Sequence, residues 1–308
     1  MVYQDAIMRK ASASGGDTSK ENYRFPGDFI LERLELIDKE GVPTDISALS
    51  LEVNILQDLF LPFMQIEIAV NDSAGFINAV SNGLSGGEII YVSFKTADPE
   101  FVMNKMLFAV NGVKERVRNT TGNETYVIEG YSLEHFNTID KKISKAFGTG
   151  SGKKINEIVQ IIFDEHIMTP ELKSVYNLYK NEGREVSKTG IQGLTTTTGL
   201  HKCVIPMYNP IEAIRYLCDE GVDDDTASKL LFYETFLGFQ FRSLGKLIKE
   251  EPKGEEFLYH PSSYNTDVYK DGMNAYFIKS VDRVKESDLT EQMTDGLFSA
   301  TTIELDPL

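Results

Sequence analysis

Apolar and polar residues alternate along three segments between residues 50 and 96. The apolar positions that share one face are Leu51, Val53 and Ile55, then Ile66, Ile68 and Val70, then Ile90, Val92 and Phe94. A period of two is typical of half-buried antiparallel strands, with the turn Ser85-Gly86-Gly87 before the third. About six such strands, beginning near Phe29, predict a small β-barrel or sandwich.

A β-hairpin is predicted next, where residues 106–118 and 125–136 flank a polar turn at residues 119–123. The far end of its first strand carries three cations at alternating positions: Lys114, Arg116 and Arg118. Alternate positions share one face of a strand. Two interpretations of this basic stripe stay open, a solvated strand face or a contact with an acidic neighbouring subunit.

The period becomes helical in residues 153–168. Apolar residues recur there at intervals of three and four, at Ile155, Ile158, Val159 and Ile162. This spacing predicts a helix with one buried face, and Pro170 is expected just past its end.

A second helix is predicted from Asn209-Pro210-Ile211-Glu212, which supplies an N-cap residue, a proline at the first helical position and a carboxylate at the third. Its expected buried stripe and terminator are Ile211, Ile214, Leu217 and Cys218, followed by Gly221. An acidic turn at Asp223-Asp224-Asp225 comes next, then a hairpin around Gly238. The segment from Tyr276 to Leu308 is again β-rich in pattern.

These patterns predict an α+β fold that is mainly β. Four parts are expected: a mobile arm at 1–27, a tube-like β-barrel at 28–136, an α+β insertion at 137–255, and the beginning of a second tube-like β domain at 256–308. With 41% hydrophobic residues, the 308-residue chain can form more than one core.

The net charge of the chain disfavours one class of function, nucleic-acid binding. With 47 acidic and 31 basic residues, the formal net charge is −16. A binder that neutralises nucleic-acid phosphates relies on clustered Lys and Arg, so that class is disfavoured, whereas a surface past which nucleic acid slides is compatible with the charge. No apolar run of about 18 residues predicts a membrane span, and the polar N-terminus does not predict a secretory signal.

Residues 148–153, with the sequence Gly-Thr-Gly-Ser-Gly-Lys, imitate a phosphate-binding loop. That loop requires a glycine five residues before its Gly-Lys pair and a Ser or Thr after the lysine. Phe147 and Lys154 occupy those two positions. The acidic pair Asp164-Glu165 belongs to the predicted helix and not to a metal-binding strand. We therefore interpret the segment as a flexible glycine-rich connection into a helix.

No residue is assigned to catalysis, to a cofactor or to a metal, and no cofactor is expected. The four histidines are scattered, at His135, His166, His201 and His260. Cys203 and Cys218 are expected to be reduced thiols, since two cysteines cannot make a disulfide framework. The run Asp223–Asp225 is interpreted as a solvated turn in preference to a calcium site, and the absence of tryptophan removes a common sugar-stacking platform.

Three blocks of sequence follow one another in order. In residues 29–96 a strand ends in Asp58-Leu59-Phe60-Leu61-Pro62-Phe63, Asn71-Asp72-Ser73 follows, and a strand runs from Gly86 to Thr96. Residues 209–247 contain NPIEAI, LLFYE and GFQFRSL, and residues 295–308 read DGLFSATTIELDPL. Together the blocks resemble the baseplate hub proteins of contractile-tailed phages, which are related to the hub half of type VI secretion spike proteins.

The resemblance implies a structural subunit of the virion tail baseplate, without enzymatic activity. It implies a homotrimeric ring that adapts a hexameric tail tube to a trimeric spike and encloses a DNA channel. The implied partners are other copies of the chain, the spike protein, the tube protein and further baseplate subunits.

Family members continue past a strand like that of residues 295–308, so the second barrel is expected to be completed beyond Leu308 or by another polypeptide. Two other classes of function remain as alternatives. One is a tail-associated cell-wall hydrolase, which requires a cleft with paired carboxylates or a metal. The other is a carbohydrate-binding module for host recognition, which requires an aromatic platform.

Overall fold

The structure is a computed structural model that describes residues 9–10, 28–73, 75, 84–96, 104–118, 123–186, 190–251, 258–259 and 277–278. Residues 5–254 form one compact unit, and residues 1–4 together with 255–308 form another. In the latter, β14 (Leu258–Tyr259) and β15 (Phe277–Ile278) pair in parallel. The rest of the β-rich segment predicted from Tyr276 onward, and all but two residues of the arm, lie outside the described residues.

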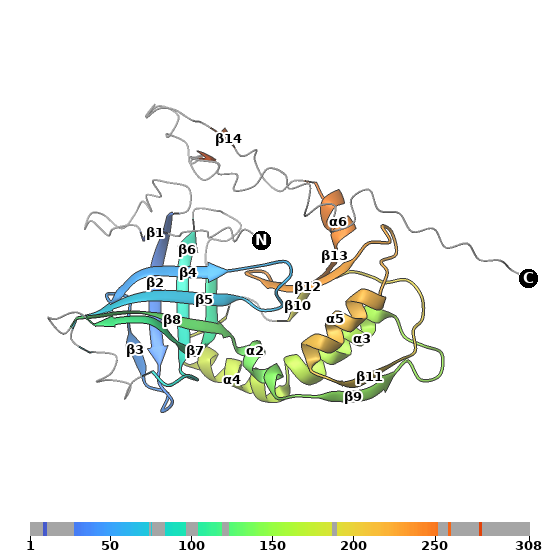
Figure 1. Ribbon diagram of the computed structural model, residues 1–308, viewed down its shortest axis with the longest axis horizontal. Coiled ribbons are helices and arrows are strands. Elements are labelled where there is room, and N and C mark those ends of the chain that lie inside the picture. The colour runs from blue at the N-terminus through green and yellow to red at the C-terminus, as the bar shows by residue number, and fades with distance from the viewer. Residues whose placement is uncertain are drawn as a thin grey trace, which may run out of the picture. The chain divides into compact units, whose positions relative to one another are not determined.

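One sheet forms the first part of the larger unit (Figure 1). Its strands are β1 (Arg9–Lys10), β2 (Asp28–Ile37), β3 (Pro43–Asp45), β4 (Ser50–Leu56), β5 (Gln65–Asp72), β6 (Ile89–Thr96), β7 (Asn104–Arg118) and β8 (Glu124–Ser132). The order is β1-β2-β6-β7-β8-β5-β4, with β3 paired to β2. The predicted hairpin is confirmed as the antiparallel pair β7–β8.

The sheet curls around an apolar core, and in Figure 1 the strands β4, β5 and β8 run across β6 and β7. Ile66, Ile68 and Val70 of β5 are fully buried in this core, as their alternation predicts. Residues between them are only half-buried. The inward side chains of β6 that the sequence placed on one face also lie here.

Two details of the strand prediction are wrong. Leu51 was placed on the buried face, but a register shift between Ser50 and Glu52 turns it outward, and Leu51 is 61% exposed. Strands β6 and β7 were expected to be half-buried, but both faces are covered along much of their length. Tyr91 and Leu107 point away from the sheet core into a second core, which the following segment supplies.

That segment adds helices and short strands on the outer side of the sheet. They are α2 (Leu133–Ile139), β9 (Ile143–Phe147), α3 (Ile155–Ile162), η2 (Phe163–Ile167), α4 (Pro170–Asn181), β10 (Ile191–Leu194), β11 (Cys203–Tyr208), α5 (Pro210–Glu220), β12 (Leu230–Thr235), β13 (Gly238–Ser243) and α6 (Leu244–Lys249). Strands β10, β13 and β12 form one small sheet, and β9 pairs with β11 in another. The fold is therefore α+β and mainly β, as predicted.

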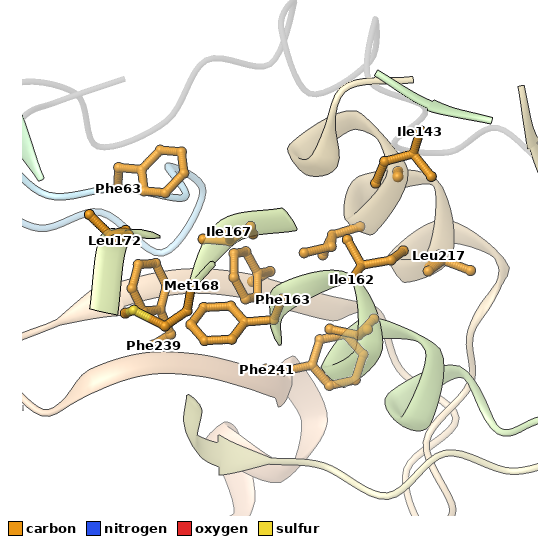
Figure 2. Close-up of a cluster of buried hydrophobic side chains, with 14 of the residues drawn as sticks. Phe63, Ile143, Ile162, Phe163, Ile167, Met168, Leu172, Leu217, Phe239 and Phe241 are labelled. Carbon is orange, nitrogen blue, oxygen red and sulfur yellow. The ribbon is translucent and has the colours of Figure 1, made fainter. Parts of the chain in front are cut away.

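Aromatic rings fill the second core (Figure 2). Phe163 lies 5.1 Å from Phe239 between ring centroids, and Phe239 stacks on Phe232 at 5.7 Å. The α3 face predicted from the sequence is fully buried in the same cluster. Phe63, which precedes β5, contacts Phe239 at 6.1 Å, so the sheet and the α+β segment share this core.

An ion-pair cluster also joins the sheet to the end of α4. Arg184 is buried, and its Nε donates to Glu35 Oε2 of β2 at 2.6 Å. Arg184 Nη1 donates to Glu182 at 2.8 Å, and Arg33 binds the other oxygen of Glu35. The sheet and the α+β segment therefore share both a hydrophobic core and these ion pairs. The domain boundary expected near residue 136 stays a prediction.

Helix ends follow local sequence signals. Asn209 and Glu212 form the predicted capping box, each side chain bonded to the other's backbone N–H at 2.8 Å, and Gly221 is the C-cap. Pro170 lies past the end of the first predicted helix, as expected. It is also the first residue of the next helix, α4, which Thr169 caps. The hairpin around Gly238 is confirmed as β12–β13, with Gly238 at a φ of +96°. Among the described residues, no helix is both long enough and apolar enough to cross a membrane.

Candidate assembly surface

The segment between β4 and β5 exposes three consecutive apolar side chains. Leu59 is 42% exposed, Phe60 62% and Leu61 44%. This segment is the Asp58–Phe63 motif of the first resembling block. Adjacent large apolar side chains in water are typical of interaction sites, whereas single ones are common on any protein surface. We call residues 58–63 the apolar loop.

Local hydrogen bonds set the shape of the apolar loop. Asp58 Oδ1 accepts from the Phe60 N–H at 2.7 Å, and the Leu61 N–H donates to the Asp58 carbonyl at 3.3 Å. Such turns are favoured by Asp at the first position. The turn directs the apolar side chains outward, and Pro62 restricts the backbone that leads back to the core.

The loop is attached to the core at its C-terminal end. Phe63 is buried against Phe239 and lies 5.3 Å from the His135 ring. The next residue, Met64, donates its N–H to Glu234 Oε2 of β12 at 2.9 Å. Ser132 Oγ donates to the same oxygen at 2.6 Å, and the Ser132 N–H donates to the Met64 carbonyl. The C-terminal end of the apolar loop, which we call its base, is therefore attached to the folded core through Phe63 and Met64.

A groove of about 200 Å³ lies beside the apolar loop. Its wall consists of loop residues and residues of α5 and β12, among them Leu59, Phe60, Pro62, Ile214, Cys218 and Leu230. Small-molecule sites typically measure about 300–1,000 Å³. The smaller size and apolar lining suit the insertion of a partner's side chains.

Charged groups border this groove without converging in it. Lys229 Nζ lies 3.8 Å from Asp219 Oδ1, and both side chains are well exposed. Burial raises the pKa of the Cys218 thiol to about 12, so this thiol stays protonated near neutral pH. The Cys218 thiol of this groove is therefore not an activated nucleophile.

The sheet also ends close to this loop. Strand β4 is last in the strand order, so its second edge carries no paired strand among the described residues. Unpaired strand edges are templates for strand addition by another chain. Leu51, turned outward by the register shift, lies on this edge strand. The open edge and the apolar loop together form the candidate assembly surface.

The basic stripe on β7 is exposed but paired within the chain. Lys114 Nζ contacts Glu67 at 2.6 Å and Glu129 at 3.6 Å. Arg116 and Arg118 both bind Glu124 of β8. A register shift between Lys114 and Val117, with Glu115 at a φ of +55°, interrupts the predicted alternation. Within this chain the stripe is an exposed strand face with its own counter-ions, and a contact with an acidic neighbouring subunit stays a prediction.

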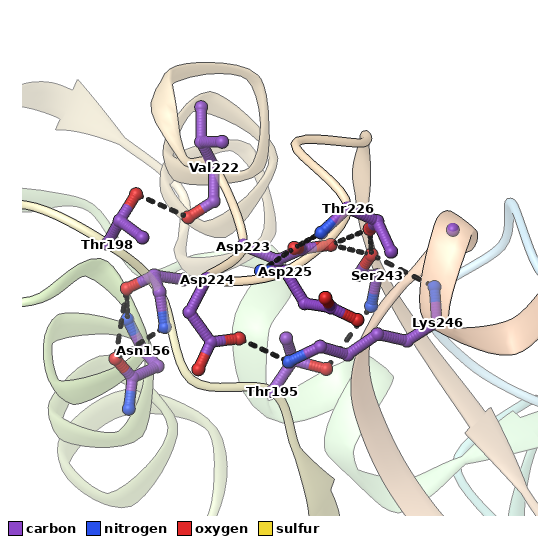
Figure 3. A network of polar contacts seen from close by, with 12 residues as sticks. Asn156, Thr195, Thr198, Val222, Asp223, Asp224, Asp225, Thr226, Ser243 and Lys246 are labelled. Atoms are coloured by element: carbon purple, nitrogen blue, oxygen red, sulfur yellow. Dashed lines mark hydrogen bonds and ion pairs between the residues drawn. The ribbon is translucent and has the colours of Figure 1, made fainter. Parts of the chain in front are cut away.

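The interpretation of Asp223–Asp225 as a solvated turn is wrong for its first residue (Figure 3). Asp223 is only 2% exposed, and its carboxylate accepts hydrogen bonds from the backbone and hydroxyl groups of Thr226 and from Ser243. Burial alone would raise the pKa of Asp223, but these hydrogen bonds hold it well below the usual value. Asp224 and Asp225, which are exposed, pair with Lys246 and Lys249.

The other sequence candidates lie apart from this surface. The glycine-rich connection leads into α3 as predicted, and backbone hydrogen bonds between Lys153 and His201 hold its end. Cys203 and Cys218 are both free thiols. Within the described part of the chain, no cluster of three or more His, Cys, Asp or Glu could hold a metal ion. His260 lies outside that part.

Several solved structures are similar to this chain, among them two tail proteins and a PdpA-VgrG complex. The tail protein from Neisseria meningitidis MC58 is 10% identical and has a TM-score of 0.36, over 68% of this chain and 49% of that one. The 43 kDa tail protein of prophage MuSo2 from Shewanella oneidensis is 12% identical at a TM-score of 0.40, over 68% and 54%. The lidded Francisella PdpA-VgrG complex is 12% identical at 0.37, over 80% and 33%.

This chain spans about half, or less, of the length of the structures it matches. No family model matches the sequence, and no curated protein matches it.

Proposed function

We propose that the chain is a structural baseplate hub subunit of a contractile tail, located in the virion. In this proposal three copies form a ring that joins a hexameric tail tube to a trimeric spike and surrounds the DNA channel. The net charge of −16 suits a lumen through which DNA passes without binding. The chain performs no catalysis in this role.

The observation that carries the proposal is the apolar loop. It belongs to a sequence block that resembles hub proteins, and it is the part of that block that exposes consecutive large apolar side chains. Its position beside an open strand edge provides both kinds of contact that assembly uses, apolar burial and backbone pairing.

A mass measurement in solution tests the proposal. We expect the full chain, alone or mixed with the spike and tube proteins of its own tail, to form a species of three copies at micromolar concentration. A chain that stays monomeric and binds neither protein under those conditions contradicts the hub assignment.

A pair of matched variants tests the surface itself. Phe60→Ser removes the most exposed apolar side chain of the loop, whereas Val42→Ser changes a 52% exposed apolar residue in the turn between β2 and β3. We expect Phe60→Ser to weaken assembly at least tenfold, which corresponds to about 1.4 kcal/mol, as for a hot-spot residue of an interface. Val42→Ser should leave assembly unchanged, and equal effects of the two variants would remove the loop from the interface.

A further inference from the structure

A small cavity lies where the sheet meets the α+β segment. Its volume is about 20 Å³, and its lining includes Ser132, Glu134, Tyr176 and Glu234. A buried site needs about 10–15 Å³ of this kind of volume to hold one water molecule. The cavity therefore has room for one water and for no sugar or peptide.

Two carboxyl groups from different elements line this cavity. Glu134 of α2 is 2% exposed and Glu234 of β12 is 8% exposed. Tyr176 Oη donates to Glu134 Oε1 at 2.8 Å. Glu134 Oε2 is buried and has no hydrogen-bond partner among the described residues. An unpaired carboxylate oxygen in such a site is costly, so a proton, a water or both must satisfy it.

Two ionised carboxylates would repel each other here. Burial raises the pKa of Glu134, and burial together with the charge of Glu134 raises the pKa of Glu234. A divalent cation is a poor alternative occupant, because magnesium and calcium take about six or more oxygen ligands. The cavity is too small to supply those ligands as waters.

We propose that Glu134 and Glu234 together bind one water molecule in this cavity and retain at least one proton between them near neutral pH. Loss of that proton to solvent leaves two carboxylates that repel each other across the cavity. Glu234 is also the acceptor for Met64 and Ser132. The proton therefore avoids this repulsion beside the acceptor that binds Met64, an inference that does not rest on the proposed function.

Other titratable groups around the pair are few. Lys105 of β7 lines the cavity and is half-buried, and Tyr176 of α4 is the donor to Glu134. Burial, followed by the charges of both glutamates, raises the pKa of Tyr176, so its hydroxyl stays a donor at neutral pH. His135, next to Glu134 on α2, packs against the rings of Phe63 and Tyr131.

The sign of the pH effect follows from the raised pKa values. The folded state binds the proton more tightly than the unfolded state, in which a glutamate has a pKa of about 4.3. Stability from this pair is therefore present below about pH 4 and falls as the pH rises through the folded pKa. Hydrogen exchange of the Met64 amide should lose up to about tenfold in protection per pH unit over that range.

The test compares wild type with Glu234→Gln and Glu134→Gln between pH 5 and 9. Melting temperatures come from thermal unfolding of the full chain, and the protection of the Met64 amide, relative to other β5 amides, comes from exchange. We expect the melting temperature of each variant, relative to wild type, to rise with pH, and the pH-dependent loss of Met64 protection to become smaller.

Glu40→Gln is the matched control, because Glu40 is exposed in the turn after β2. It should keep the wild-type pH dependence. The proposal is overturned if Glu234→Gln also keeps it, or if Lys105→Met abolishes it and so assigns the titration to Lys105. A rise in melting temperature with millimolar magnesium or calcium that Glu234→Gln removes would equally overturn it, since a cation would then occupy the cavity.

Discussion

Two buried acidic sites in the α+β segment behave in opposite ways. Asp223 is surrounded by donors, including the N–H groups of Asp225, Thr226 and Ala227, and its pKa is lowered. Glu234 has two donors and a second carboxyl group nearby, and its pKa is raised. Both side chains are at most 8% exposed. Burial raises the pKa of both carboxyl groups. At Asp223 the many donors outweigh this effect, whereas at Glu234 burial and the charge of Glu134 outweigh the two donors.

The two sites also stabilise different connections. Asp223 closes a turn within the α+β segment and links it to Ser243 at the start of α6. Glu234 links β12 to the end of the curled sheet through Met64 and Ser132. Asp223, the ionised site, connects residues within the α+β segment. Glu234, the protonated site, connects that segment to the curled sheet.

The largest effect is expected when the ionised site is removed. Asp223→Ala removes the acceptor that several N–H and O–H donors share, among them the fully buried Ser243 hydroxyl, and the loss is destabilising. We expect the melting temperature to fall by roughly 5–10 °C in a thermal unfolding measurement. Asp225→Ala, which removes an exposed partner of Lys249, should change it little. A similar small fall in both variants would show that the donors find water instead.

A second prediction concerns the contribution of Asp223 to stability at acid pH. Because the folded pKa of Asp223 lies below its unfolded value of about 3.9, its stabilisation is present above that pH and is lost as the pH falls further. The difference in unfolding free energy between wild type and Asp223→Asn should therefore narrow from pH 5 to pH 2. Denaturant unfolding across this range measures it, and a constant difference would mean that Asp223 makes no contribution as an ion.

The smallest effects are expected when one donor is removed from each site. Thr226→Val and Ser132→Ala each delete one hydroxyl donor and should cost roughly 1 kcal/mol. The two variants should differ in how their stability depends on pH. Asp223 keeps other donors and should stay ionised in Thr226→Val, whereas Ser132→Ala should raise the pKa of Glu234 further. Titration of both variants by thermal unfolding distinguishes these outcomes, and identical pH profiles would contradict the comparison.

Local signals predicted the elements well. The alternation in β5 and the capping box at Asn209 each depend on residues close in sequence, so a pattern along the chain contains the needed information. Thr169-Pro170 is the same kind of local signal, an N-cap residue followed by a proline at the first position of α4.

The candidate surface and the buried carboxyl pair depended on tertiary contacts. Leu59, Phe60 and Leu61 look like core residues in the sequence, and only the turn at Asp58 shows that they face solvent. Glu134 and Glu234 are 100 positions apart and meet because α2 and β12 pack at the same end of the sheet. Most donors to Asp223 lie within five residues of it, and the burial of its carboxylate depends on the packing around Ser243, which is distant in sequence.

The second core makes the curled sheet depend on the segment that follows it. Tyr91 and Leu107, on the outer face of the sheet, are buried by the segment that follows α2. A polypeptide cut after α2 would leave these side chains and Arg184's partner Glu35 in water. The sheet cannot be treated as a transferable module, and any relative that keeps the sheet but replaces the α+β segment must also exchange the residues on this outer face.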